Sequence, residues 1–216
     1  MTDLLPIFVR LEGRRVVLIG GGPVAASKLS ALLAAGADVR VIAPDVHPDI
    51  ERAGVAVERR EFVPADLDGA WLAVAAATPA VNRAVADAAA GRRLFVNAVD
   101  DPANASAFLS GVVRRGGVTL AISTHGDAPG LTALMREALE VVLPDDLDAW
   151  VLEARRQRAA WRRDGVPMAE RRPLLLEALN RLYAGKAGRA APRDGSVAEP
   201  EEARAAARAG SEESWR

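Results

Sequence analysis

RRVVLIGGGPVAASKLSALLAAGADVRVIAPD, residues 14–45, places three consecutive glycines between an apolar run and a stretch of helical composition. The β-branched run 15–20 ends at glycine and predicts a buried strand. Residues 23–36 open with proline and close with glycine, which is the asymmetry of a helix. Residues 38–44 predict a second strand. A strand, a helix and a strand in about thirty residues form a βαβ unit.

The alternation of strands and helices continues to residue 99. We expect strands at 55–62, 70–78 and 93–99, and a helix from Pro79 to Ala90. Such alternation predicts a mainly parallel sheet with helices on both faces. The expected fold class is therefore α/β, with a Rossmann-type sheet.

The alternation then stops. Residues 106–124 predict two strands joined by Arg-Arg-Gly-Gly, a hairpin signal. Residues 130–143 predict an amphipathic helix that ends before Pro144. Its apolar positions are Leu131, Leu134, Met135, Ala138, Leu139 and Val142. Two further helices are expected at about 146–163 and 169–184. From residue 186 the composition predicts a disordered tail.

Composition excludes several classes of protein. The formal net charge of 216 residues is −1, so no overall field attracts nucleic acid or an anionic membrane. There is no cysteine, which excludes disulfides and thiolate metal sites. The N-terminus lacks a secretory signal, and no apolar run reaches the roughly 18 residues of a membrane span. We expect a cytoplasmic protein.

Gly20, Gly22 and Ala25 fit the dinucleotide pattern G-x-G-x-x-G/A. The first glycine permits the tight turn, the second lets a diphosphate approach the backbone, and the third small residue lets helix and strand pack closely. Asp45 follows the second strand, where a carboxylate binds the ribose hydroxyls, which favours NAD over NADP. The alternative is a tight turn in a sheet that binds nothing.

Polar residues follow two other strands at the carboxyl edge of the sheet, where ligands of open parallel sheets bind. Thr78 ends one run, and Asn97, Asp100, Asp101 and Asn104 leave another. A carboxylate beside a nicotinamide can accept a proton while hydride leaves the substrate. Asp100 is therefore a candidate base, although Asp-Pro turns and caps explain the same residues.

The stretches LPIFVRLEGRRVVLIGGGPVA, NAVDDPANASAF and LAISTHGDAPGLTALMREALE together resemble precorrin-2 dehydrogenase, the first module of siroheme synthase. The resemblance covers residues 4–150 well and 151–185 loosely. It implies NAD-dependent oxidation of precorrin-2, a tetrapyrrole, to sirohydrochlorin, and for some members insertion of ferrous iron to give siroheme. It places the essential aspartate of the family at Asp100.

The resemblance places cofactor contacts of the family at Gly22, Pro23, Val24, Pro44 and Asp45. With Gly20 of the glycine pattern and Thr78 at the sheet edge, these are the predicted cofactor-binding residues. The predicted substrate-binding residues are Asn97, Ser123, Thr124 and His125. The resemblance further implies a homodimer built after the Rossmann sheet, so we expect four segments: an NAD-binding domain 1–112, a dimerisation region 113–148, a helical domain 149–185 and the tail 186–216.

The chain departs from the family at His125, which stands where relatives have glycine in a Ser-(Ser/Thr)-Gly-Gly stretch. Histidine there is either a tolerated loop residue or a base or metal ligand near the tetrapyrrole. His47 is expected alone in a loop. Two isolated histidines form no metal site, so none is predicted.

Residues 150–172 are rich in arginine, which pairs with carboxylates in a directional, two-pronged way. The arginines are Arg155, Arg156, Arg158, Arg162, Arg163, Arg171 and Arg172. They are expected either to hold the carboxylate rim of precorrin-2 or to form a solvated helix face. Two functions other than dehydrogenation stay open: a non-catalytic NAD-sensing module, and a protein that is chiefly a sirohydrochlorin ferrochelatase.

Overall fold

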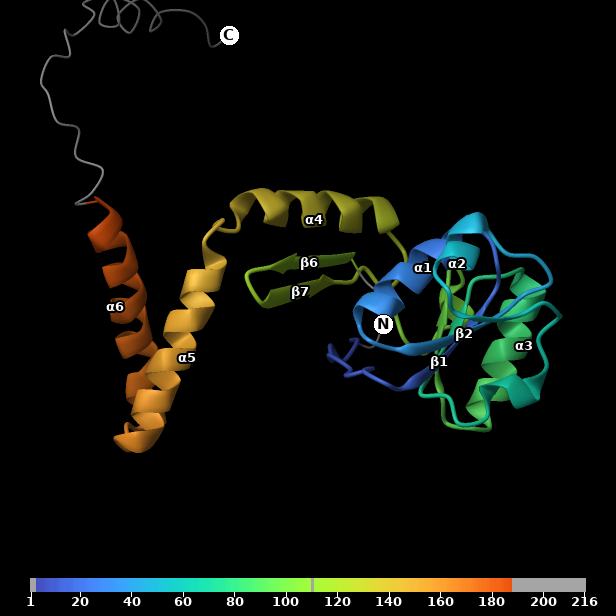
Figure 1. Ribbon diagram of the computed structural model, residues 1–216, viewed down its shortest axis with the longest axis horizontal. Coiled ribbons are helices and arrows are strands. Elements are labelled where there is room, and N and C mark those ends of the chain that lie inside the picture. Colours follow the sequence, from blue (N-terminus) through green and yellow to red (C-terminus); the bar gives the residue numbers. More distant parts are fainter. Residues whose placement is uncertain (1–2, 110, 188–216) are drawn as a thin grey trace, which may run out of the picture. The chain divides into compact units, whose positions relative to one another are not determined.

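The computed structural model describes residues 3–109 and 111–187 (Figure 1). The chain forms two compact units, with the boundary between Asp148 and Ala149. The sequence-based boundary after residue 112 falls inside a strand, Gly111–Arg115. Of the tail expected from residue 186, residues 186 and 187 belong to the last helix and 188–216 lie outside the described residues.

The first unit contains a five-stranded parallel sheet in the order β3-β2-β1-β4-β5. Its strands are β1 (Arg15–Ile19), β2 (Asp38–Ile42), β3 (Ala56–Glu58), β4 (Leu72–Ala75) and β5 (Phe95–Ala98). All five predicted strands form, and the α/β fold class is confirmed. The strands are shorter than predicted, most of all β3 and β4.

Helices cover both faces of this sheet (Figure 1). They are α1 (Pro23–Ala34), α2 (Pro48–Arg52) and α3 (Pro79–Ala90), with the short 3-10 turns η1 (Pro64–Leu67) and η2 (Pro102–Asn104). Alternate residues of β1 point to opposite faces. Leu18 therefore packs with Leu29 of α1, and Ile19 packs with Val85 of α3.

Helix α2 was not expected, although His47 lies in the loop before it, as the sequence predicts. His47 is the N-cap of α2, and its Nδ1 accepts a hydrogen bond from the Asp49 N–H at 3.2 Å. The cap residues that usually predict a helix start are serine, threonine, aspartate and asparagine. A five-residue helix with a histidine cap carries little periodic signal.

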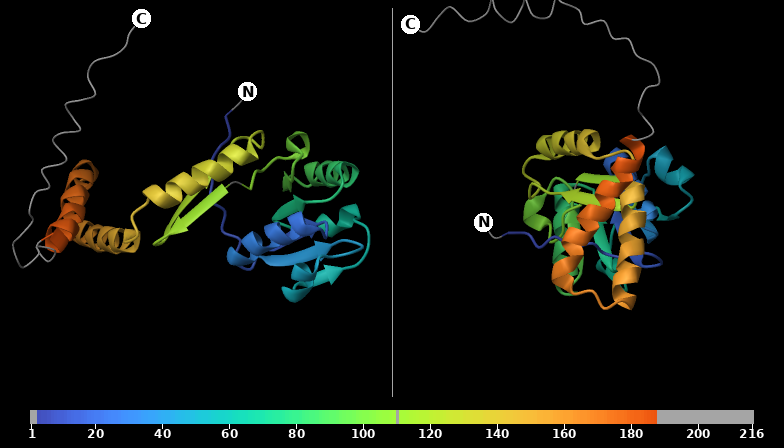
Figure 2. Two further views of the ribbon diagram at one scale, coloured as in Figure 1. Left: turned by 90° about the horizontal axis from the view of Figure 1, so that it is seen from above. Right: turned by 90° about the vertical axis from the view of Figure 1, so that its left-hand side faces the viewer.

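A hairpin and one helix follow the sheet: β6 (Gly111–Arg115), β7 (Val118–Ile122) and α4 (Pro129–Val142). Gly116 and Gly117 form the two-residue turn with φ of 54° and 79°, as a type I′ turn requires. Helix α4 packs along the hairpin (Figure 2). However, α4 has no buried residue, and Leu131, Leu134 and Met135 are exposed.

The second unit is an antiparallel pair of helices, α5 (Leu147–Arg163) and α6 (Met168–Ala187), as Figure 1 shows. The Trp150 and Tyr183 rings meet edge to face with centroids 6.1 Å apart, and the Trp150 Nε1–H donates to the Tyr183 hydroxyl. Trp161 of α5 and Ala178 of α6 are buried. Both predicted helices are confirmed.

Candidate cofactor and substrate site

Gly20 forms the turn at the end of β1. Its φ is +118°, a conformation that side chains rarely adopt, and a Cβ there would lie 2.2 Å from the Ala76 carbonyl oxygen. Ala76 directly follows β4, and β1 lies between β2 and β4 in the sheet. The ends of β1 and β4 therefore approach closely at the point where the strand order reverses, which is where open α/β sheets bind ligands.

Gly21 has a role that the sequence analysis missed. A Cβ on Gly21 would lie 1.8 Å from the Asp45 carbonyl oxygen, so the loop after β2 packs directly on its backbone. The His47 N–H donates to the Gly21 carbonyl at 2.7 Å and holds this contact. The signal was present in the run of three glycines, because the G-x-G-x-x-G/A pattern explains only two of them.

Gly22 differs from Gly20 and Gly21 because a Cβ on Gly22 would meet nothing within 4 Å. It is the N-cap of α1, no side chain caps the helix, and its first turn holds no acidic residue. The free N–H groups and the positive end of the helix dipole suit an anion. Ala25, the third position of the pattern, is fully buried against the sheet. These residues fit a dinucleotide diphosphate.

The loop after β2 presents Pro44 and Asp45, both exposed, while its backbone is fixed against Gly21. Ile50 of α2 is fully buried in the core beside α1 and anchors the far end of the loop. The Asp45 carboxylate is therefore held at the strand end where ribose hydroxyls of a dinucleotide are bound.

Asn82 fixes the loop after β4. Its side chain is 2% exposed, and its Oδ1 accepts a hydrogen bond from the Ala77 N–H at 3.2 Å. Thr78 is the N-cap of α3, but its side chain makes no capping hydrogen bond and is exposed. Asn82 thus fixes the loop from the protein interior, while Thr78 lies at the surface.

Asp100 follows β5 in a strained conformation. Its φ is +54°, in the left-handed region that aspartate tolerates better than most residues, and it is exposed. Asp101 differs, because its Oδ2 accepts a hydrogen bond from Asn104 Nδ2 at 2.8 Å across η2. Strained residues persist where the surroundings hold them, and they gather at functional sites.

A cleft of about 790 Å³ joins these strand ends. Its walls include Val24 from α1, Ala77 from the β4 loop, Asn82 from α3, and both Asp100 and Asn104 after β5. The structure therefore brings the predicted cofactor residue Val24 and the predicted base Asp100 to one cavity.

Asn97 lies deeper than a contact residue for substrate usually does. It is 6% exposed on β5, and its Nδ2 donates to the Ala107 carbonyl at 3.0 Å. The N–H groups of Ser106 and Ala107 both donate to the Val96 carbonyl, so the chain after η2 returns to β5. Asn97 Oδ1 is buried without a partner among the described residues. Its amide fixes the segment that follows Asp100.

The loop after β7 holds Ser123, Thr124 and His125. His125 has a φ of +58°, in the left-handed region that favours glycine. Its N–H donates to the Ser123 Oγ at 3.3 Å, and Thr124 Oγ1 lies 3.0 Å from the Thr132 hydroxyl of α4. Thr124 is therefore engaged with its own loop and helix.

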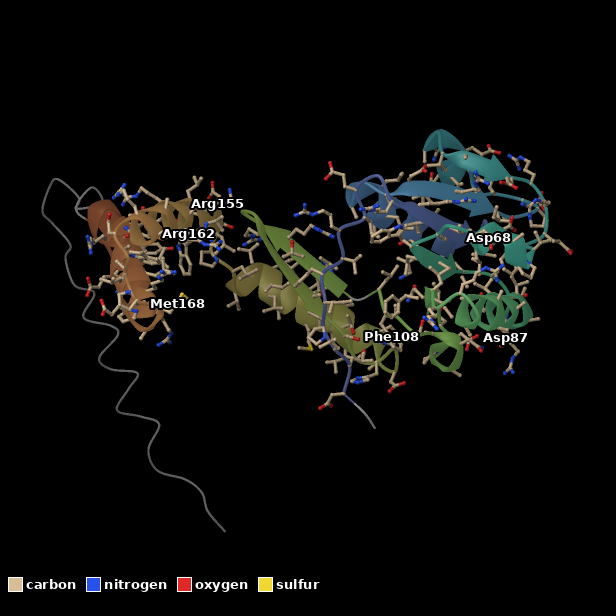
Figure 3. The ribbon with its side chains drawn as sticks, turned by 90° about the horizontal axis from the view of Figure 1, so that it is seen from below. Asp68, Asp87, Phe108, Arg155, Arg162 and Met168 are labelled. Atoms are coloured by element: carbon tan, nitrogen blue, oxygen red, sulfur yellow. The ribbon has the colours of Figure 1, made fainter. Side chains whose placement is uncertain are left out.

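This loop touches the segment after β5. A Cβ on Gly126 would lie 3.2 Å from Pro102 of η2 and 3.4 Å from the Phe108 ring, whose position is labelled in Figure 3. The predicted substrate residues at 123–125 thus adjoin the turn that carries Asp101 and Asn104. No group of three potential metal ligands occurs in residues 3–109 and 111–187.

Comparison with known proteins agrees with this geometry. A family model described as "Putative NAD(P)-binding" matches residues 7–111. The chain is 41% identical over 175 residues to siroheme synthase 3 of Aeromonas hydrophila subsp. hydrophila, covering 79% of this chain and 37% of that protein. It is 38% identical over 187 residues to siroheme synthase of Photorhabdus laumondii, covering 84% of this chain and 40% of that protein.

A solved structure, the precorrin-2 dehydrogenase SirC, matches with a TM-score of 0.62 and 26% identity over 81% of this chain and 88% of that chain. The chain spans about 40% of the length of siroheme synthase from Photorhabdus. Within the described part, no helix is long and apolar enough to cross a bilayer. The chain is therefore similar in sequence to part of siroheme synthase and in structure to a precorrin-2 dehydrogenase, and its residues 7–111 match an NAD(P)-binding family.

Proposed function

We propose that this chain oxidises precorrin-2 to sirohydrochlorin with NAD as the oxidant. The observation that carries the proposal is the cleft that extends from Val24, in the first turn of α1, to the exposed carboxylate of Asp100, with the open position at Gly22 two residues before Val24. A reaction that removes a hydride and a proton from one substrate needs an acceptor for each. The cleft offers a place for both at one edge of the sheet.

Several parts of the chain hold the cofactor in this proposal. The diphosphate binds at the open end of α1, to the backbone N–H of Gly22 and to the N–H groups of the first helical turn. Pro23 has no N–H and cannot donate. Asp45 accepts hydrogen bonds from the ribose hydroxyls and repels the 2′-phosphate of NADP. The Thr78 hydroxyl, which caps no helix N–H, is free to donate toward the nicotinamide half.

NAD, when bound, supplies the acceptor for the hydride. Asp100 takes the proton that leaves the substrate, and its left-handed backbone directs the carboxylate from the end of β5. Asn82 and Asn97 act at a distance, because Asn82 fixes the loop after β4 and Asn97 fixes the segment at Ala107 that returns to β5. Ser123 and His125 contact the substrate in this proposal, because their loop packs against Pro102 of η2.

The test is to incubate the purified chain with NAD and precorrin-2 in the absence of oxygen. The proposal predicts formation of NADH and sirohydrochlorin in equal amounts. A protein that only senses NAD would bind the cofactor and leave precorrin-2 unchanged. Adding ferrous iron afterwards tests the iron step separately: loss of the sirohydrochlorin spectrum faster than without the protein would add ferrochelatase, a lyase activity, to the function.

We also propose that the chain works as a homodimer formed through β6, β7 and α4. A two-stranded sheet under one helix buries little, and such hairpins are marginally stable alone. The side of α4 that packs on the hairpin includes Thr132, whose methyl lies beside Gly111. The apolar stripe that periodicity predicts as the packing face, including Leu131 and Leu134, is exposed instead. A second copy would cover this stripe.

A further inference from the structure

The positive charge of this chain is concentrated in one unit. Residues 149–187 hold nine basic and four acidic side chains, a net charge of +5, whereas residues 1–148 hold 14 basic and 19 acidic side chains, a net charge of −5. The balance near zero of the whole chain therefore hides a cationic helical pair. Such a local field attracts an anion even where the total charge does not.

The acids near α5 are neutralised by particular arginines. Arg156 donates two hydrogen bonds to Glu153, at 2.9 and 2.8 Å, and Arg163 donates to Asp164 at 2.9 Å. The bonds from Arg156 and then Gln157 lower the pKa of Glu153 to about 2, so it stays ionised and engaged. Each of these acids is therefore held by an arginine close to it in the sequence.

Three other arginines of α5 form what we call the arginine row: Arg155, Arg158 and Arg162. Their spacing of three and four residues places them on one face of the helix, over about 10 Å of its axis. All three are exposed, and none has a carboxylate within 4 Å among the described residues. Arg155 and Arg162 are labelled in Figure 3.

The fold alone does not account for the row. Cations in the last turn of a helix are favoured by its dipole, which explains Arg162 and Arg163. Arg155 and Arg158 lie further from that end. Like charges three or four residues apart repel one another and weaken the helix, and nearby acids could have relieved this. An external anion that binds the row would remove the repulsion.

We propose that the arginine row binds carboxylate arms of the tetrapyrrole substrate, an inference that rests on the proposed function. Precorrin-2 carries acetate and propionate groups around its ring, and guanidinium groups pair with carboxylates through two parallel hydrogen bonds. Three guanidinium groups in a line fit several arms along one side of a flat molecule. A nucleic acid is disfavoured, because three guanidinium groups over about 10 Å are fewer than the roughly 6–10 phosphate contacts of a typical nucleic-acid-binding surface.

The test compares two variants of the full chain by titration with sirohydrochlorin, followed by its absorbance, and by steady-state turnover. The first variant, R155Q/R158Q/R162Q, removes the row. The second, R156Q/R163Q, removes two exposed arginines of the same helix that already have carboxylate partners. Circular dichroism and thermal unfolding establish that both variants fold.

The row variant should raise the Kd for sirohydrochlorin and the KM for precorrin-2 by about tenfold or more, since hydrogen bonds to charged groups are lost. Its kcat and NAD affinity should not change, and R156Q/R163Q should behave as wild type. An R155K/R158K/R162K variant should recover only part of the affinity, because lysine keeps the charge and loses the paired geometry.

Equal sirohydrochlorin affinity in the row variant and wild type would overturn the inference, as would an equal loss in both glutamine variants. A parallel titration with RNA tests the other anion. If the row variant loses RNA binding that the wild type shows, while its sirohydrochlorin affinity is unchanged, the row is a nucleic-acid site and the inference is overturned. If sirohydrochlorin binds through the row but no NADH forms from precorrin-2, the proposed function fails while the row stays a tetrapyrrole site.

Discussion

Gly21 and Gly22, in the turn after β1, are required for different reasons. Gly21 has no room for a Cβ because the Asp45 carbonyl lies 1.8 Å from where it would stand, whereas the space at Gly22 is open. Gly22 has a φ of −77°, which any residue can adopt. Gly21 is therefore needed for folding, and Gly22 is needed for the approach of the cofactor diphosphate.

This contrast gives a prediction with its own control. Gly21→Ala should lower the free energy of unfolding by about 1–3 kcal/mol, the usual result of overpacking. Gly22→Ala should fold as wild type but bind NAD about tenfold more weakly, because the methyl occupies the approach of the diphosphate. Urea unfolding and calorimetric titration with NAD separate the two effects. A Gly22→Ala protein with wild-type NAD affinity would contradict the placement of the diphosphate.

A site residue was predictable when the sequence pattern that indicates it lies within a few neighbouring elements of the chain. Gly20, Gly22 and Asp45 follow from a pattern within one βαβ unit, and the structure places all three at the same strand edge. The packing of Gly21 against Asp45 depends on a contact across 24 positions, which no local pattern reports. The buried amide of Asn82 likewise acts through a backbone N–H that only the fold identifies.

At the scale of elements, the connection from β3 to β4 contains a buried carboxylate, Asp66, that pairs with the partly exposed Arg60. Asp66 of η1 is 6% exposed and accepts hydrogen bonds from the Arg60 guanidinium and from the Val63 N–H. The bond from Arg60 is the main cause that lowers the pKa of Asp66 below its usual 3.8. The ionised form of Asp66 is thus favoured more in the folded chain than in the unfolded chain.

The stability from Asp66 is therefore present above its unfolded pKa and disappears as the pH falls through its lower folded pKa. Asp66→Asn should lower the free energy of unfolding at neutral pH by about 1–3 kcal/mol. It should also flatten the loss of stability below pH of about 4. Arg60→Gln should produce the same flattening, and the two changes together should cost less than their sum. Urea unfolding measured between about pH 3 and pH 7 checks this. If the free energy of unfolding falls as steeply at acid pH in Asp66→Asn as in wild type, the Arg60–Asp66 pair does not control the acid sensitivity.

The types of the longer elements were predictable because hydrophobic periodicity and turn residues agree for each of them. The predicted Pro79–Ala90 helix has the bounds that the structure gives α3. Strand ends and α2 were not predictable, because they depend on hydrogen bonds to neighbours, such as those between β2 and β3, over only three residues. Periodicity also identified the apolar stripe of α4 but not what covers it.

At the scale of the whole molecule, that uncovered stripe makes the oligomeric state testable. Leu134→Glu places a charge on the exposed apolar stripe of α4 and should convert the proposed dimer to a monomer, since burying an unpaired charge opposes association. Ala133→Glu adds the same charge to a different, exposed face of the helix and should stay dimeric. Sedimentation velocity measures both. A Leu134→Glu protein that stays dimeric would place the interface elsewhere.

The most direct test of the account measures NADH formation from precorrin-2 by Asp100→Asn, with NAD binding measured on the same material. Asparagine tolerates the left-handed backbone of Asp100 and lacks only its basic carboxylate. The matched control is Asp101→Asn, a carboxylate of the same cleft that is already bonded to Asn104. The account predicts unchanged NAD affinity, turnover reduced by about 10²–10⁴-fold in Asp100→Asn, and turnover largely kept in Asp101→Asn. Wild-type turnover by Asp100→Asn would contradict it.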